Sequence, residues 1–256
     1  MNRKIIIVVL MLLLSLSIKT TYAYWASEVT SNAAVNTSDV CVGTWTIITA
    51  HYNFEESSIL QDLIDDGSSV VVGSFTNTGS SLQSSYGVIY IPNPLESYTI
   101  SVRAQLLSAT VNGGFGVLFD TYATDSTSQS DNGWIFQYDQ GYSAGELIIR
   151  PRINGAEQAP VLRYSVYFDA NGELSTTGTK DSTNVWWENE HTVKLDVSVL
   201  NAETGQKRVM VYIDDEYLFS YDFISTLFDS TSLDNITGFR TWRENTAFYE
   251  ITIETE

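Results

Sequence analysis

The sequence of 256 residues contains few of the residue types that cross-link a chain or bind nucleic acid. Cys41 is the only cysteine, so no disulfide can form within the chain. The only histidines are His51 and His191, and there are four prolines. Lys and Arg together number 13 against 31 Asp and Glu residues, which gives a formal net charge of −18. Because such a chain repels nucleic acid and anionic lipid, we expect neither as a partner.

The N-terminal apolar run is shorter than the roughly 20 residues that a membrane-spanning helix needs. This run, Ile5–Ile18, has 14 residues, follows Arg3 and Lys4, and precedes Thr21-Tyr22-Ala23. A basic start, an apolar centre and small residues at the end are typical of a secretory signal. We therefore expect residues 1–23 to be a signal peptide and the protein to be secreted or at the cell surface. A retained membrane anchor is the alternative.

Residues 24–44 are mostly small and polar, and we expect them to form a flexible lead or an added strand. Residues 45–256 are expected to form a single β-sandwich domain, since β-domains can run to about 250 residues as one unit. Cys41 is expected to be a buried, small apolar side chain.

Period-two alternation predicts β-strands along most of this domain. Val193, Leu195 and Val197 alternate with polar residues, and the segments 100–106 and 209–213 repeat the pattern. One face of each strand is therefore expected in the core and the other in solvent. Only two short segments, Ser57–Asp65 and Phe223–Asp229, suggest helices.

Asn-Gly pairs lie between the alternating runs and readily take the positive φ angles of tight hairpins. They are Asn112-Gly113, Asn132-Gly133, Asn154-Gly155 and Asn171-Gly172. Four such pairs predict antiparallel pairing, and the sequence as a whole predicts an all-β fold.

Several segments together resemble a concanavalin A-like jelly roll over about residues 45–256. They are Gly114–Asp120 (GFGVLFD), Gly133–Tyr138 (GWIFQY), His191–Val197 (HTVKLDV), Val211–Glu216 (VYIDDE), Gly238–Trp242 (GFRTW) and Tyr249–Ile253 (YEITI). The closest types are laminin G-like and 3-keto-disaccharide-hydrolase-like domains. The hairpin carries Asp215-Glu216 where that pattern prefers glycine. The resemblance implies an antiparallel two-sheet sandwich, in which members often hold a structural calcium ion.

The N-terminal segment Thr21–Ala26 (TYAYWA) resembles the signal region of exported matrix and fibre proteins of Gram-positive and related bacteria. This second resemblance implies an alternative function as a structural subunit of an extracellular matrix, with residues 24–45 donated as a strand.

Catalytic motifs are weak. Gly141–Gly145 matches the G-x-S-x-G string of serine hydrolases, but its position between two strands favours a turn. The E-x-D-x-x-E string of laminarinase-type enzymes is absent from the sequence. Glu188 and Glu190, beside two tryptophans, form the nearest acidic pair, with an exposed loop edge as the alternative. His191 starts a strand and is expected to be structural. We expect no catalysis, and a glycoside hydrolase is the alternative.

Carboxylates at the two ends of the domain suggest a cation site. Glu55 and Glu250 could share one metal ion, and oxygen ligands suit Ca²⁺. A second possible set flanks a hydroxyl-rich loop and consists of Asp120, Asp125, Asp131 and Asp139. Ordinary solvated carboxylates are the alternative for both.

The aromatic content, with 6 Trp and 15 Tyr, suits the apolar faces of sugars. Trp134, Phe136 and Tyr138 share one strand face, which is expected to be core. The opposite, polar face offers hydrogen-bonding partners for a glycan. We expect a non-catalytic carbohydrate-binding or adhesion module for a glycan or cell-surface polysaccharide. The expected ligand-binding residues are Arg103, Gln137, Asp139, Arg150 and Arg152, with Arg240 also on an outward position.

The signal-peptide prediction can be tested on protein recovered from the native host. N-terminal sequencing should find Tyr24 as the first residue, because cleavage after Ala23 removes the apolar run. Recovery of intact Met1 would favour the membrane anchor.

Overall fold

The computed structural model describes residues 48–56, 58, 60, 70–107, 113–123, 129–142, 145–168, 174–175, 179–180, 186–226 and 235–255. The chain divides into two compact units, Met1–Trp45 and Thr46–Glu256, and all described residues belong to the second. The predicted signal peptide, the polar lead and Cys41 lie outside the described residues. Among those that are described, no helix is long and apolar enough to cross a membrane.

Antiparallel strands make up nearly all of the described chain. They are β1 (Ile48–Asn53), β2 (Val70–Asn77), β3 (Leu82–Pro92), β4 (Tyr98–Leu106), β5 (Gly114–Ala123), β6 (Asp131–Asp139), β7 (Glu146–Ile153), β8 (Ala156–Glu157), β9 (Leu162–Ser165), β10 (Tyr167–Phe168), β11 (Leu174–Ser175), β12 (Thr179–Lys180), β13 (His191–Asn201), β14 (Gln206–Ile213), β15 (Glu216–Ile224) and β16 (Asn235–Thr255).

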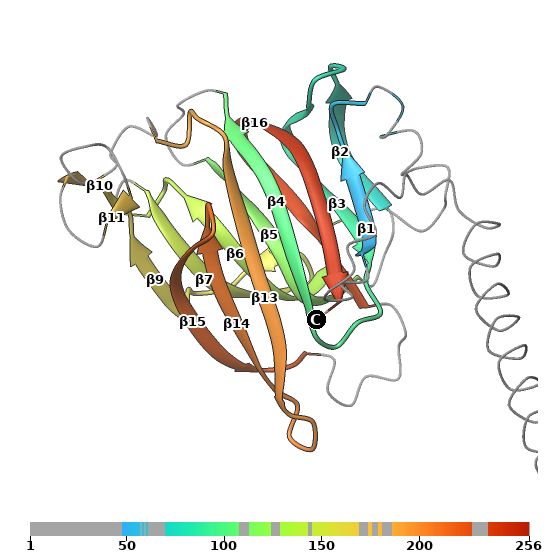
Figure 1. Cartoon of the computed structure of the whole chain (residues 1–256), viewed down its shortest axis with the longest axis vertical. Coiled ribbons are helices and arrows are strands. Elements are labelled where there is room, and N and C mark those ends of the chain that lie inside the picture. The colour runs from blue at the N-terminus through green and yellow to red at the C-terminus, as the bar shows by residue number, and fades with distance from the viewer. Residues whose placement is uncertain are drawn as a thin grey trace, which may run out of the picture. The chain divides into compact units, whose positions relative to one another are not determined.

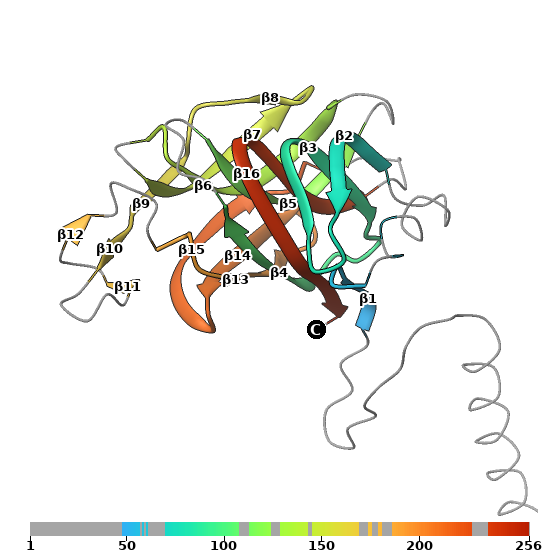
Figure 2. The ribbon, with the colours of Figure 1, turned by 90° about the horizontal axis from the view of Figure 1, so that it is seen from above.

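Two layers of strands share one curled, hydrogen-bonded sheet (Figures 1 and 2). The first layer contains β15, β14, β13, β4 and β1, and the second contains β2, β3, β5, β6, β7, β8 and β9. The long strand β16 belongs to both: Asn235–Trp242 pair with β5, whereas Thr246–Thr255 pair with β4. Strands β11, β10 and β12 form a small separate sheet.

The main core lies between the layers and consists of the apolar residues of each alternating strand. Val193, Leu195 and Val197 of β13 are fully buried, as their alternation predicts. In the second layer, Phe136 and Tyr138 of β6 face the same core. The predicted all-β, antiparallel two-sheet sandwich is confirmed.

The turn predicted at Asn154-Gly155 is confirmed. Asn154 and Gly155 have φ angles of 49° and 72° and connect β7 to β8, as predicted. Asp214 and Asp215, with φ of 52° and 66°, make the two-residue turn between β14 and β15 without a glycine.

The Asn132-Gly133 prediction is wrong, because both residues lie inside β6. A Cβ atom at Gly133 would lie 2.5 Å from the Cα of Thr121, so the glycine permits close contact with β5 rather than a turn. The predicted helix at Phe223–Asp229 is also wrong at its start, where Phe223 and Ile224 continue β15. Asn112, the Asn171-Gly172 pair and most of Ser57–Asp65 lie outside the described residues.

A buried ion pair joins the two layers. The Lys207 Nζ on β14 donates to the Asp120 Oδ1 on β5 at 2.8 Å, and both residues are buried. Asp120 also accepts hydrogen bonds from the Ser225 hydroxyl at 2.9 Å and the Thr226 backbone N–H at 2.9 Å. These hydrogen bonds and the charge of Lys207 compensate the Asp120 carboxylate for its loss of hydration.

We predict that Lys207→Met lowers the free energy of unfolding by about 3 kcal/mol, because it leaves a buried carboxylate without its cation. Urea denaturation would measure the change. Lys194→Met is the matched control, since Lys194 pairs at 3.0 Å with Asp215, whose side chain is 89% exposed. That control should cost less than about 1 kcal/mol, and an equal loss in both variants would contradict the prediction.

Candidate functional site

Polar side chains gather on the face of the second layer that points away from the main core. Gln137 and Asp139 of β6 alternate with the core residues Phe136 and Tyr138. The register of β6 and β7 puts Arg150 opposite Ile135, on the same face as Gln137. Arg152, two residues further along β7, shares this face.

Strand β16 adds residues to the same face from the far end of the sequence. Arg240 lies opposite Gly116 of β5, and Trp242 lies opposite Gly114. Gly116 in turn lies opposite Gln137 of β6, so Arg240 and Gln137 flank a glycine. Residues about 100 positions apart in the sequence are thereby brought together.

The two glycines of β5 allow the neighbouring strand and side chains to approach closely at the centre of this face. A Cβ atom at Gly114 would lie 2.9 Å from the indole ring of Trp242. A Cβ atom at Gly116 would lie 2.9 Å from the Cγ of Gln137. The backbone of β6 is closer still, since the Tyr138 carbonyl oxygen would lie 2.0 Å from a Cβ at Gly114, so a larger residue would collide with the strand as well as with these side chains.

The hairpin at Asn154-Gly155 folds β8 back along β7 and brings Glu157 to this face. The Glu157 carboxylate accepts hydrogen bonds from the guanidinium groups of both Arg150 and Arg240. It also accepts one from the Gln137 Nε2 at 2.9 Å. We call Arg150, Arg152, Arg240 and Glu157 the arginine cluster.

One end of the arginine cluster is structural. Arg152 is buried and donates two hydrogen bonds to the Asp131 carboxylate and one, of 2.6 Å, to the Gly155 carbonyl. The Tyr90 hydroxyl donates to the same carboxylate at 2.7 Å. Burial raises the pKa of the Tyr90 phenol well above its usual value, and the charge of Asp131 and this hydrogen bond add to the rise. Arg152, a predicted ligand residue, therefore holds the β7–β8 hairpin in place.

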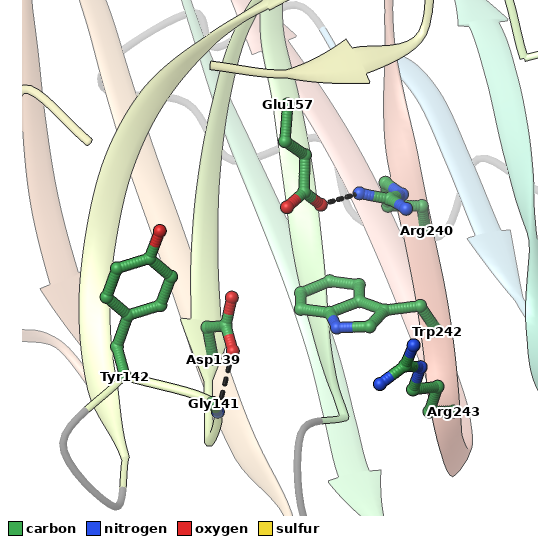
Figure 3. Close-up of a pocket in the computed structure, with 7 residues that line it drawn as sticks. All are labelled: Asp139, Gly141, Tyr142, Glu157, Arg240, Trp242 and Arg243. Carbon is green, nitrogen blue, oxygen red and sulfur yellow. Dashed lines mark hydrogen bonds and ion pairs between the residues drawn. The ribbon is translucent and has the colours of Figure 1, made fainter. Parts of the chain in front are cut away.

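The other end of the arginine cluster opens into a pocket of about 550 Å³. Figure 3 shows Tyr142 and Asp139 on one wall, Arg240, Trp242 and Arg243 on the other, and Glu157 at one end. The Arg240 guanidinium stacks over the Trp242 ring at 4.8 Å, and those of Arg150 and Arg163 lie 4.9 and 5.2 Å from the Tyr142 ring. Such cation–π contacts fix the aromatic walls.

The two carboxyl groups of the pocket have pKa values displaced in opposite directions. Burial raises the pKa of Asp139, and the negative charge of Glu157 adds to the rise despite a hydrogen bond from the Gly141 N–H. Burial also acts to raise the pKa of Glu157, but Arg240, Gln137 and Arg150 outweigh it and the net shift is downward. Glu157 is therefore firmly ionised, whereas Asp139 takes up a proton more readily than an ordinary aspartate.

The structure brings together four of the five predicted ligand residues and separates Arg103 from them. Arg103 lies on β4 of the first layer, where it pairs with Glu55 at 3.0 Å, Glu190 at 2.8 Å and Glu250 at 3.5 Å. A guanidinium thus lies between Glu55 and Glu250, the two residues predicted to share a metal ion. No group of three or more His, Cys, Asp or Glu side chains suited to a metal ion occurs among the described residues. The structural Ca²⁺ stays a prediction.

The other sequence candidates take structural positions. Residues 140–142 form a turn after β6, as expected for the start of the G-x-S-x-G string, and Ser143 itself lies outside the described residues. The His191 Nδ1 lies 2.6 Å from the Asp214 carboxylate, and its ring stacks on Trp186 at 3.7 Å. Glu188 and Glu190 lie in an exposed turn rather than on a strand.

Sequence reasoning missed Glu157, Tyr142, Trp242 and Arg243 as site residues. Trp242 could have been found from the sequence. Arg240 was predicted to point outward, and residues two apart on a strand lie on the same face. Glu157 and Tyr142 lie in short connections, where no periodic signal exists.

No protein-family model matches the sequence, and no curated protein matches it. Solved structures do match. The carbohydrate recognition domain of Emp46p aligns with a TM-score of 0.52 at 8% identity, over 78% of this chain and 93% of that one. The legume lectin-like domain from Entamoeba histolytica aligns with a TM-score of 0.51 at 6% identity, over 86% and 100%. The fold is a concanavalin A-like jelly roll.

A third solved structure, the GH43 protein BlXynB from Bacillus licheniformis, aligns with a TM-score of 0.51 at 6% identity. The match covers 85% of this chain and 41% of that one. At these identities the three matches establish the fold of the jelly roll and nothing about its ligand.

We predict that Asp139→Asn raises the free energy of unfolding at pH 7. The folded-state pKa of Asp139 lies above its unfolded value near 3.8, so folding penalises its carboxylate at neutral pH. The gain should shrink as the pH falls through the folded pKa and vanish below about 3.8. Denaturation curves at pH 7 and pH 3.5 would measure it.

Asp222→Asn is the control with the opposite sign. A hydrogen bond from Arg208 lowers the pKa of Asp222, so its carboxylate favours the folded state at neutral pH. That variant should lose a little stability at pH 7. Loss of stability in Asp139→Asn as well would contradict the prediction.

Proposed function

We propose that this protein is an exported carbohydrate-binding module and that the pocket between Tyr142 and Trp242 holds the saccharide. Export is supported by the signal-like N-terminal sequence, Arg3 to Ala23. Binding is supported by the pocket.

The observation that carries the proposal is the combination of aromatic walls with planar, charged hydrogen-bonding groups. Trp242 and Tyr142 offer apolar ring surface to the C–H faces of a sugar. Arg240, Glu157 and Asp139 line the same pocket and can donate to or accept from its hydroxyl groups. These polar groups are fixed by one another before any ligand arrives, which lowers the entropy cost of binding.

The matched folds support the same function. Two of the three structures compared above are, by their descriptions, a carbohydrate recognition domain and a legume lectin-like domain. This chain covers nearly all of each. The fold therefore suits saccharide binding, and the pocket supplies the chemistry.

The pKa of Asp139 is raised and that of Glu157 is lowered, and this difference favours a second candidate function, that of a glycoside hydrolase. A carboxyl group that holds its proton and a neighbouring carboxylate that stays ionised are the acid and base or nucleophile that such enzymes need. However, hydrogen bonds from two arginines and a glutamine engage the Glu157 carboxylate and weaken it as a base. Binding without catalysis is therefore the better-supported function.

A glycan array, run on the purified protein with and without calcium, tests the proposed function. Trp242→Ala should weaken binding about tenfold or more, because it removes one aromatic wall of the pocket. Tyr217→Ala is the matched control, since Tyr217 is 55% exposed on β15 and belongs to the first layer. That control should bind as the parent does.

Three results would contradict the proposal. Silence of the parent protein across a broad array would favour the matrix subunit. Equal losses of binding in Trp242→Ala and Tyr217→Ala would mean that the saccharide does not bind in this pocket. Release of reducing sugar that is lost in Asp139→Asn would favour the hydrolase.

A further inference from the structure

Arginine side chains gather around the pocket in a number that a neutral saccharide would not require. Five of the eight arginines in the sequence lie in or beside it, although the chain has a formal net charge of −18. They are Arg150, Arg152, Arg163, Arg240 and Arg243. An acidic protein has no general reason to concentrate its arginines on one face.

Two of these arginines each have a hydrogen-bonded carboxylate that no other arginine uses. Arg152 pairs with Asp131, and Arg163 pairs with Glu146 at 2.5 Å. Their charges are therefore balanced within the protein.

Arg150 and Arg240 are not balanced in this way, because they share the single carboxylate of Glu157. The next carboxyl group, that of Asp139, lies 3.9 Å from the Arg150 Nη2, which is too far for a hydrogen bond. Burial also favours the neutral form of Asp139 by raising its pKa. Arg150 and Arg240 thus have one hydrogen-bonded carboxylate between them, and Asp139 is a more distant ion-pair partner of Arg150.

Buried donors at the pocket point to the same conclusion. Arg240 lines the pocket and is only 7% exposed, yet its Nε–H makes no hydrogen bond within the protein. The Nε and Nη2 of Arg150 are likewise unpartnered. Burial, together with the positive charge of Arg152, lowers the pKa of Arg240 despite the opposing effect of Glu157 and Asp131. A buried charged donor without an acceptor is costly unless a ligand supplies one.

We propose that the bound saccharide is acidic, and that the carboxylate of a uronate-type sugar binds at Arg240 on the wall that Arg243 extends. This inference rests on the proposed function and names the class of its ligand. A carboxylate is planar and accepts hydrogen bonds from a guanidinium fork in matching geometry. The sugar ring attached to it then lies against Trp242, which the Arg240 guanidinium already covers on one side.

The test compares an oligogalacturonide with its fully methyl-esterified form on the purified protein by titration calorimetry. The two ligands share their rings and linkages and differ in charge. The free acid should bind about tenfold or more tightly than the ester, because the ester cannot make the charge-assisted hydrogen bonds.

A substitution at an exposed arginine tests where the preference for the acid arises without disturbing the buried arginine cluster. Arg243→Gln should reduce the preference for the acid by about threefold, since it removes a rim charge. Arg208→Gln is the matched control, because Arg208 is exposed on β14 of the first layer and pairs with Asp222 at 2.6 Å. It should keep the full preference.

The outcomes separate this inference from the proposed function. If the ester binds as tightly as the acid, or only neutral saccharides bind, the inference is overturned and the proposed function stands. If both variants lose the preference equally, the effect is one of net charge and the site assignment is overturned. If no saccharide binds at all, both fail.

Discussion

The single constraint on which this structure depends is the membership of β16 in both layers. Its first half pairs with β5 and its second half with β4, so one strand connects the two faces of the sandwich. Along the first half, Phe239 is buried in the core while Arg240 and Trp242 face the pocket. A shift of β16 by one residue would exchange these roles and remove core and pocket together. The position of the pocket is therefore fixed by the same pairing that fixes the fold.

The arginine cluster shows how much charge this fold keeps out of water. Buried ion pairs contribute little net stability, because the loss of hydration offsets their attraction. Here one carboxylate serves two guanidinium groups, and several of their donors make no hydrogen bond within the protein. An apolar face of the same size would serve stability as well or better. The retention of such a cluster beside a pocket is what is expected of a binding site, where stability is given up for function.

The same cluster separates the two functions considered for the pocket. Glu157 and Asp139 are both carboxyl groups in one pocket, yet the arginines stabilise the charge of one while burial disfavours the charge of the other. A hydrolase needs a pair of this kind with at least one carboxylate free to act on the substrate. Because the carboxylate of Glu157 is engaged by protein donors, its position suits recognition better than chemistry.

The sequence alone determined the strands, their buried faces and the local turns. Alternation in β13 and in β6 assigned the core residues correctly, because burial acts on every second side chain of a strand. The Asn154-Gly155 turn was predictable for a similar reason, since its φ angles are set within the two residues.

Only the tertiary structure decided which outward residues meet. Arg103 and Arg150 look equivalent in the sequence, but β4 and β7 belong to different layers. Glu157 and Arg240 come together because of strand order and a folded-back hairpin, and a long-range pairing of this kind leaves no periodic trace in the sequence around either residue.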